Sequence, residues 1–188
     1  MIIVTGGAGM IGSNLIKYLN DRGEQKILLV DNLTDGQKIF NLADLKISDY
    51  MDKQDFIENC VDIFKKNQIR AVVHLGACSA TDEWNGRYLM KNNFTYTKQI
   101  FTECQKNETL FLYASSASVY GLGEKGFSDQ SNDYVPINAY AYSKLLFDQY
   151  LTNRHQKLTA PAIGLRFFNV YGPREAHKGK MSSPEHKF

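Results

Sequence analysis

Short runs of apolar residues alternate along this chain with longer segments whose apolar residues recur every three or four positions. The apolar runs cover residues 2–4, 26–31, 71–76, 110–116 and 162–168. Strands that are apolar at nearly every position are typical of a parallel sheet covered on both faces. Their alternation with helical segments predicts an α/β fold, a doubly wound parallel sheet of the Rossmann type.

Helices are expected between these strands, near residues 10–21, 53–66, 84–106 and 138–154. The segment before the last of them, GLGEKGFSDQSNDYVPIN, contains the Gly, Ser, Asn and Pro residues that interrupt regular structure. From about Gly172 the chain becomes polar and contains Gly and Pro, which marks a change in organisation.

Composition narrows the class of protein only modestly. The 188 residues, 43% of them hydrophobic, are enough for one domain with a sizeable core. A net charge of +2 with both signs evenly spread gives no argument for nucleic acid or a membrane surface as partner. No stretch approaches the roughly 18 apolar residues of a membrane span. The N-terminus has no features of a secretory signal, so we expect a cytoplasmic protein.

The cysteines indicate a reducing compartment. Cys60, Cys78 and Cys104 are odd in number and widely spaced, and they form neither a CxxC pair nor a cluster with histidines. This pattern favours reduced thiols packed in the core over a disulfide frame or a zinc site. We therefore expect no bound metal ion.

A glycine-rich segment, TGGAGMIG, directly follows the first apolar run and precedes the first helix. It satisfies GxGxxG through Gly7, Gly9 and Gly12, and TGxxGxxG through Gly6, Gly9 and Gly12. Glycines permit a tight turn and close approach of the backbone to a pyrophosphate, while the helix N-terminus offers N–H groups and its dipole. The order of strand, glycine turn and helix indicates a dinucleotide site. A glycine-rich turn without a ligand is the alternative.

The residues leave the choice between NAD and NADP open. Asp31 ends the second apolar run, 24 residues after Gly7, close to where an acidic residue accepts a hydrogen bond from the adenosine ribose. That position favours NAD. Lys38, and also Lys53, could instead neutralise a 2′-phosphate if the loop 32–38 folds over the ribose.

Tyr140 and Lys144 lie four residues apart in NAYAYSKLLFDQY and therefore share one face of the expected helix. A nearby ammonium favours the phenolate and lowers the pKa of the tyrosine, which would make the phenol a usable base near neutral pH. The same spacing also arises by chance on a solvated helix face, where it needs no function. The residues around the pair must decide between these interpretations.

Taken together, the motifs resemble the extended short-chain dehydrogenase/reductase family of nucleotide-sugar enzymes. They are TGGAGMIG at the start, HLGA after the fourth strand, SSASVYG after the fifth, Tyr140 with Lys144, and RFFNVYGP after the sixth. DNLTDGQK, ACSATDEWNG and FNVYGPREAHKGKMSS are similar, more narrowly, to the branch of epimerases that act on ADP-heptose. The resemblance covers residues 1 to about 183. It implies an isomerase that inverts C6″ of a lipopolysaccharide core precursor, and a homo-oligomer in the full-length family.

The resemblance also implies roles for individual residues. Tyr140 would act as acid/base, Ser116 would hydrogen-bond the reacting oxygen, and Lys144 would hold the nicotinamide ribose and support the phenolate. Lys178 would be a second acid/base group on the opposite face of the sugar, although without the resemblance it reads as a solvated lysine. The substrate would contact Ser116, Asn169 and Lys180.

Further residues would line the dinucleotide, and the family generally prefers NADP, which favours the phosphate-binding interpretation of Lys38. The implied cofactor residues are Gly6, Gly9, Met10, Ile11, Gly12, Asp31, Asn32, Lys38, Lys53, Leu75, Gly76, Ala77, Cys78, Ser79, Asn92, Lys144 and Val170.

The end of the chain departs from the family pattern. Family members continue into a substrate domain, whereas this chain reads SSPEHKF, with Lys187 where the family uses a histidine near the substrate. We therefore expect a dinucleotide-binding Rossmann domain at residues 1–171. Residues 172–188 would be the start of a substrate-binding region with a truncated or altered tail, the substrate domain being largely absent.

Three functional hypotheses follow. The first is an NADP-dependent epimerase of ADP-heptose whose activity is impaired by truncation. The second is another nucleotide-sugar epimerase or a dehydratase, although SSASVYG lacks the Asp-Glu pair that a dehydratase would carry there. The third is a non-catalytic NADP-binding fragment.

Overall fold

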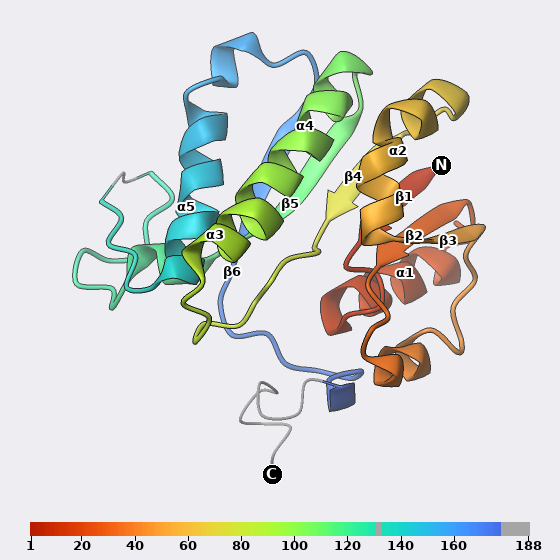
Figure 1. Ribbon diagram of the computed structural model, residues 1–188, viewed down its shortest axis with the longest axis horizontal. Helices are drawn as coiled ribbons and strands as arrows, with labels where there is room; N and C mark the ends of the chain where they lie inside the picture. Colours follow the sequence, from red (N-terminus) through yellow and green to blue (C-terminus); the bar gives the residue numbers. More distant parts are fainter. Residues whose placement is uncertain (131–132, 178–188) are drawn as a thin grey trace.

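The computed structural model describes residues 1–130 and 133–177, and within them six parallel strands form a single sheet (Figure 1). The strand order is β3-β2-β1-β4-β5-β6, which confirms the predicted Rossmann-type α/β fold. The strands are β1 (Ile2–Thr5), β2 (Ile27–Asp31), β3 (Asp49–Asp52), β4 (Ala71–His74), β5 (Leu110–Ser116) and β6 (Ala162–Phe167).

Helices connect the strands close to the predicted positions. They are α1 (Met10–Asp21), α2 (Lys53–Lys66), α3 (Gly86–Leu89), α4 (Tyr96–Lys106) and α5 (Ala139–Thr152), with short 3₁₀ helices η1 (Gly36–Asn41), η3 (Ala117–Tyr120) and η4 (His155–Lys157). The single helix expected at 84–106 is interrupted by a π-helical segment, η2 (Met90–Thr95), between α3 and α4. Such a segment is often found at a functional site.

Strand β3 does not belong to any of the apolar runs. Its sequence, DYMD, is polar and largely exposed because it forms the outer edge of the sheet, so hydrophobic patterning gives no signal there. The family resemblance places HLGA after a fourth strand, whereas the apolar runs supply only three strands up to that point. Strand β3 is the one that the runs leave out. Asp52 then caps α2 by accepting a hydrogen bond from the Gln54 N–H at 2.7 Å.

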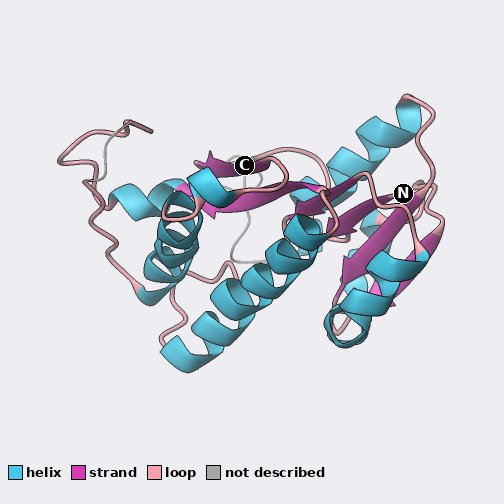
Figure 2. Ribbon diagram, turned by 90° about the horizontal axis from the view of Figure 1, so that it is seen from above, coloured by secondary structure: helices cyan, strands magenta, loops and turns pink. Residues whose placement is uncertain are grey.

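One face of the sheet is covered by α2, α4 and α5, which together bury the larger core (Figure 2). Phe56 of α2, Phe101 of α4 and Phe147 of α5 are each at most 4% exposed and meet Phe111 of β5 or its neighbours. Full burial of one such side chain contributes about 1.5–3 kcal/mol. This aromatic layer fixes α5 against β5.

The opposite face is covered by α1 over β1 and β2, where Ile16 packs with Val4 and Leu29. Under β6 that face is open among the described residues, and Ile163 and Leu165 are 47% and 39% exposed. Because all the strands are parallel, their carboxyl ends meet at one edge of the sheet, and the loops at that edge are where such sheets bind ligands.

Candidate active site

The predicted site residues follow the carboxyl ends of all six strands (Figure 1). These residues are Gly6 after β1, Asp31 at the end of β2, Lys53 after β3, Leu75 after β4, Ser116 at the end of β5 and Asn169 after β6. The strand order reverses between β1 and β4, which is the switch point where open parallel sheets bind ligands. The fold therefore brings the described site residues to one edge.

The glycine-rich turn has no room for side chains. Gly6 has φ +69°, and a Cβ there would lie 2.6 Å from the backbone nitrogen of Gly76, in the loop after β4. A Cβ on Gly12 would lie 2.2 Å from the carbonyl oxygen of Gly6. The loops after β1 and β4 thus approach as closely as backbones allow, and α1 begins at the turn with its N-terminus toward the switch point. This geometry is suited to a pyrophosphate.

Asp31 ties the glycine turn to β2. Its buried carboxylate accepts hydrogen bonds from the Ala8 N–H at 2.8 Å and the Asn32 N–H at 2.6 Å. The Lys38 ammonium lies 3.0 Å from the same carboxylate and also donates to the Asn32 carbonyl. The structure therefore brings the predicted residues Asp31, Asn32 and Lys38 together. Ribose binding by Asp31 stays a prediction.

Lys53 and Asn92, also assigned to the dinucleotide by resemblance, are in direct contact. The Lys53 ammonium donates to the Asn92 side-chain oxygen at 2.9 Å, and the Tyr96 hydroxyl donates to the Lys53 carbonyl at 3.0 Å. This contact joins the start of α2 to the π-helical segment η2. Both polar groups remain at the carboxyl edge.

Asn93, which sequence reasoning missed, organises the loop after β4. The Cys78 N–H donates to its side-chain oxygen at 2.9 Å, and its amide donates to the Cys78 carbonyl and to the Ser143 hydroxyl of α5, both at 3.0 Å. Asn93 is 2% exposed. A signal exists in the sequence, because a polar residue at this position falls on the same helix face as Leu89 and Ile100.

The cysteines are all free, as expected, but only two lie in the core. Cys60 and Cys104 are buried, and burial raises the pKa of the Cys60 thiol to about 12 and that of Cys104 further. Cys78 is half-buried in the loop after β4, so core packing was the wrong expectation for it. Its position there agrees with the cofactor role that the resemblance implies.

Tyr140, Lys144 and Ser116 meet where α5 begins beside the end of β5. The helix starts at Asn138, whose side-chain oxygen accepts the Ala141 N–H at 2.7 Å. Tyr140 is hydrogen-bonded to Ser116. Lys144 is 7% exposed and donates to the Ala114 carbonyl at 2.8 Å. A buried ammonium is incompatible with the solvated-face interpretation of the Tyr140 and Lys144 pair.

Burial governs the protonation of both groups. It lowers the pKa of Lys144 to about 8, against the opposing effect of the Asp148 carboxylate. It raises the pKa of Tyr140, and the hydrogen bond with Ser116 acts in the lowering direction. The expectation that Lys144 lowers the Tyr140 pKa is therefore wrong for the protein in this structure, because loss of hydration dominates.

A buried polar network lies one turn beyond Lys144. Asp148 accepts hydrogen bonds from the Tyr113 hydroxyl and the Ser115 hydroxyl, both at 2.8 Å, and from Arg166 Nε at 3.1 Å. Arg166 in turn donates to the hydroxyls of Tyr120 and Tyr134. In the described part of the chain, every buried side-chain nitrogen and oxygen has a hydrogen-bond partner.

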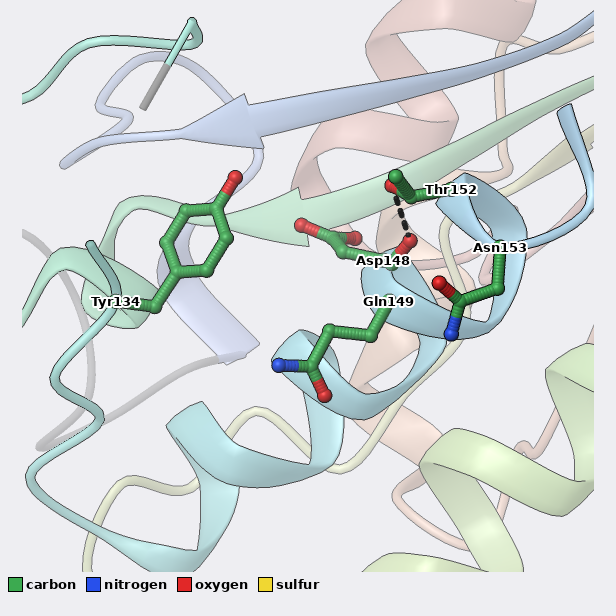
Figure 3. A pocket seen from close by; sticks show the side chains of 5 residues that line it. All are labelled: Tyr134, Asp148, Gln149, Thr152 and Asn153. Carbon is green, nitrogen blue, oxygen red and sulfur yellow. Dashed lines mark hydrogen bonds between the residues drawn. The ribbon is translucent and has the colours of Figure 1, made fainter. Parts of the chain in front are cut away.

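A cavity of about 260 Å³ lies against α5 beyond this network (Figure 3). It is lined by Tyr134, Asp148, Gln149, Thr152 and Asn153. The Thr152 hydroxyl donates to the Asp148 carbonyl at 2.9 Å on its wall. None of the predicted cofactor or reacting residues lines this cavity, so it is separate from the candidate active site.

The remaining predicted site residues lie in the last part of the chain. Asn169 is exposed and Val170 half-buried after β6, whereas Lys178 and Lys180 lie outside the described residues. Within residues 1–130 and 133–177, no three His, Cys, Asp or Glu side chains gather closely enough to hold a metal ion. The same ranges contain no helix with the length and apolar character to span a membrane.

A Rossmann-type sheet with a glycine turn at its switch point, and a half-buried tyrosine with a buried lysine beside a serine, defines a dinucleotide-binding protein of the short-chain dehydrogenase type. The chain belongs to the NAD dependent epimerase/dehydratase family, whose sequence model matches residues 2–186. Over all 188 residues it is 55% identical to ADP-L-glycero-D-manno-heptose-6-epimerase of Alkalilimnicola ehrlichii. It spans 58% of that protein's length.

Solved structures agree with this assignment. The chain is similar to the Helicobacter pylori ADP-L-glycero-D-manno-heptose-6-epimerase, with TM-score 0.80, 28% identity, and coverage of 97% of this chain and 59% of that one. UDP-N-acetylglucosamine 4-epimerase from Methanobrevibacter ruminantium gives TM-score 0.81 and 27% identity at the same coverage. UDP-glucuronic acid 4-epimerase from Bacillus cereus, solved with NAD, gives 0.77 and 25% over 92% and 58%. The resemblance to nucleotide-sugar epimerases is confirmed, and a nicotinamide dinucleotide is the cofactor it supports.

Proposed function

We propose that the protein is an epimerase that converts ADP-D-glycero-D-manno-heptose to its L-glycero epimer at C6″, a step in the synthesis of a lipopolysaccharide core precursor. The observation that carries this proposal is the Tyr140 phenol, hydrogen-bonded to Ser116 and one helical turn before the buried Lys144, at the same edge as the glycine turn. The 55% identity to an ADP-heptose epimerase supports the choice of sugar nucleotide.

The glycine turn fits the dinucleotide that this reaction requires. A Cβ on Gly6 or Gly12 would clash with neighbouring backbone, so only glycine allows the tight turn. Such a turn lets backbone N–H groups approach a pyrophosphate directly. When bound, the nicotinamide supplies the hydride acceptor and donor. The protein's own residues supply orientation and proton transfer.

Proton transfer falls to Tyr140. The Ser116 hydroxyl holds the reacting oxygen of the sugar, and Tyr140 accepts the proton of the C6″ hydroxyl as the hydride leaves that carbon. The resulting ketone is planar at C6″, so return of the same hydride to the opposite face gives the other epimer. The resemblance makes Lys178 the proton donor on that second face. The hydride returns to the sugar, while the proton that Tyr140 took is replaced by one from Lys178. Proton exchange with solvent then restores both residues, and the net redox change is zero.

The raised pKa of Tyr140 sets a condition on this mechanism. Burial favours the neutral phenol, whereas positive charge close to the ring favours the phenolate. The positive charge of an oxidised nicotinamide would act in that second direction. We infer that Tyr140 becomes an effective base only in the complex with the cofactor.

The activity is tested by incubating the protein with each ADP-heptose epimer and NADP and following the C6″ configuration by NMR. Tyr140→Phe should lower the rate by about 10²–10⁴-fold while leaving dinucleotide affinity nearly unchanged. Tyr142→Phe is the matched control, because Tyr142 is 49% exposed two residues further along the helix. A Tyr140→Phe enzyme with the full rate would overturn the acid/base role.

We further propose that NADP is preferred over NAD. Lys38 is 24% exposed and partly balances the charge of Asp31, so the edge of β2 can accept the negative charge of a 2′-phosphate. Lys38→Ala should weaken NADP binding by roughly tenfold to a hundredfold, the worth of one charge-assisted hydrogen bond, and leave NAD binding almost unchanged. Lys46→Ala removes the same charge from an exposed position nearby and serves as the control. Equal losses for both dinucleotides would contradict the proposal.

A second candidate function is epimerisation of a UDP-sugar. The structural similarity to the UDP-N-acetylglucosamine 4-epimerase of Methanobrevibacter ruminantium, at TM-score 0.81, is the observation that favours it. Inversion of a UDP-sugar but not of ADP-heptose in the NMR assay would decide for it. Dinucleotide binding without any inversion would leave a non-catalytic binding protein.

Compartment and assembly complete the proposal. The three free cysteines support a reducing, cytoplasmic location. We also propose a homo-oligomer, as the family resemblance implies. Light scattering of the purified protein tests the assembly directly.

A further inference from the structure

The chain after β6 crosses the carboxyl edge of the sheet to the far side of the candidate active site (Figure 1). Residues 168–177, here called the strap, leave β6 beside β5 and end next to η1 and the start of α1. Asn14 of α1 donates to the Pro173 carbonyl at 3.0 Å, and the Asn41 amide donates to the Arg174 carbonyl at 3.2 Å. The strap therefore runs from the Tyr140 side of the site to the glycine-turn side.

The far end of the strap is fastened by Arg174. Its guanidinium makes two hydrogen bonds of 2.8 Å to the two carboxylate oxygens of Asp44 and donates to the Asn41 carbonyl. The Arg174 backbone has φ +72°, a conformation that side-chain-bearing residues adopt only where surrounding contacts hold them. Glu175, fully buried, accepts the Gly172 N–H at 2.7 Å and closes the turn around Arg174.

Asn41 links this fastening to the glycine turn. Its amide, 6% exposed, donates to the Ala8 carbonyl at 2.9 Å and lies 3.0 Å from the His177 ring nitrogen. Ala8 in turn donates its N–H to Asp31, which is paired with Lys38 of η1. The strap, the glycine turn and η1 thus form one continuous hydrogen-bonded unit.

We propose that Asn41, Asp44 and Arg174 form a positioning anchor that couples dinucleotide binding at the glycine turn to the placement of the strap. The proposal rests on the proposed function in so far as a dinucleotide must bind. A ligand that fixes the glycine turn and η1 also fixes the surface to which the strap is attached. By linkage, the factor by which the ligand stabilises the attached strap equals the factor by which loosening the strap lowers the affinity for the ligand.

The anchor also bears on the chemistry. The strap starts beside the residues that act on the sugar and ends at the anchor, and the next residue in the chain after His177 is Lys178, the proposed second acid/base group. Coupling would therefore make the position of the strap, which leads in sequence to Lys178, depend on a bound cofactor. Asn41, Asp44 and Arg174 would act through other residues, without touching the reacting atoms.

Two measurements on the same protein test the coupling. Hydrogen exchange of peptides covering residues 168–177 should slow several-fold when NADP is added. In Arg174→Ala, the strap should exchange faster without NADP, and NADP affinity measured by calorimetry should fall on the order of fivefold. Arg154→Ala is the control. It removes the same charge from a surface side chain that stacks on Tyr150, away from the strap.

Asp44→Ala gives a second variant that spares the fold, because the Asp44 side chain is 54% exposed. It should reproduce the effect of Arg174→Ala, and the double variant should show no further loss, as expected for two partners of one contact. Independent, additive losses in the double variant would count against a shared anchor.

The outcomes separate this inference from the proposed function. NADP binding of normal affinity in Arg174→Ala and Asp44→Ala, with unchanged exchange of the strap, would overturn the coupling alone. Coupled binding without any epimerisation of ADP-heptose would overturn the proposed activity and keep the anchor. Failure of the unaltered protein to bind either NADP or NAD would overturn both.

Discussion

The two ends of the carboxyl edge are built by opposite means. At the β1–β2 end, the site is shaped by backbone, because Gly6 and Gly12 pack so closely against neighbouring backbone that neither has room for a Cβ. At the β5–α5 end, the site is shaped by side chains. Asp148 forms an ion pair with Arg166, and its carboxylate also favours the charged form of the buried Lys144. The first end is sensitive to atoms added, and the second to partners removed.

The difference follows from what each end must do. A pyrophosphate is recognised by N–H groups that the backbone already carries, so the protein needs only a turn tight enough to present them. Proton transfer needs titratable groups away from water, and a buried charge is tolerated only when it is paired and hydrogen-bonded. Asp148 therefore serves both stability and the electrostatics of Lys144.

The largest expected effect is removal of a partner at the β5–α5 end. Asp148→Ala leaves Arg166, Tyr113 and Ser115 without their acceptor and should cost about 3–5 kcal/mol in the free energy of unfolding. Urea unfolding measures this cost. Gln149→Ala, at the exposed neighbouring position, should change stability by less than about 0.5 kcal/mol. A loss at Asp148 as small as the control would break the comparison.

A single added methyl group at the β1–β2 end comes next. Gly12→Ala would place its Cβ 2.2 Å from the Gly6 carbonyl oxygen, so the turn must shift, at a cost of about 1–3 kcal/mol. Dinucleotide binding, measured by calorimetry, should be lost because the turn no longer fits. Gly36→Ala has open space around the new Cβ and should leave both properties nearly unchanged. Normal dinucleotide affinity in Gly12→Ala would contradict the backbone-shaped site.

The smallest effect concerns His74, which joins the two ends at the switch point. Its ring contacts the Thr5 hydroxyl at 2.6 Å and the Thr97 hydroxyl at 2.8 Å, and burial lowers its pKa from 6.5 to about 3. Between pH 6.5 and about pH 3, His74 is protonated in the unfolded chain but neutral in the folded protein. This contribution to stability is therefore complete above pH 6.5 and falls as pH drops, by up to about 1.4 kcal/mol per pH unit.

Urea unfolding between pH 7 and 5 checks this pH dependence. His74→Asn should be less stable at pH 7, because the bridging hydrogen bonds are weakened, but its stability should fall less steeply with pH. Parallel pH profiles for the variant and the unaltered protein would show that His74 contributes nothing to the pH dependence.

Most of the fold could be predicted from the sequence, because parallel strands buried on both faces are apolar throughout. Strand β3 was invisible to that pattern, since an edge strand exposed to water can be polar. The π-helical segment η2 was invisible as well, because its residues have ordinary helical spacing. In both cases, the position of the segment in the folded protein determined its structure, and the local sequence did not.

The site divides in the same way. Gly6, Gly12, Tyr140 and Lys144 could be predicted because each belongs to a motif of fixed spacing within a few neighbouring residues. Asn93 has one signal, its polar side chain on the helix face of Leu89 and Ile100. Asn41 and Arg174 have none, because each acts through contacts with residues that lie far from it in the sequence. The direction of the Tyr140 pKa shift was also missed, since it depends on burial and not on the neighbouring lysine.

The strand order has a consequence for how the chain assembles during synthesis. β1 precedes the other five strands in the sequence, yet it lies in the middle of the sheet between β2 and β4. β2 can pair with it early, but its other side has no partner until residues 71–74 have left the ribosome. Contacts so distant in sequence form slowly. During part of synthesis, β1 therefore has one unpaired apolar edge. An exposed edge of this kind favours aggregation with other chains until β4 pairs with it.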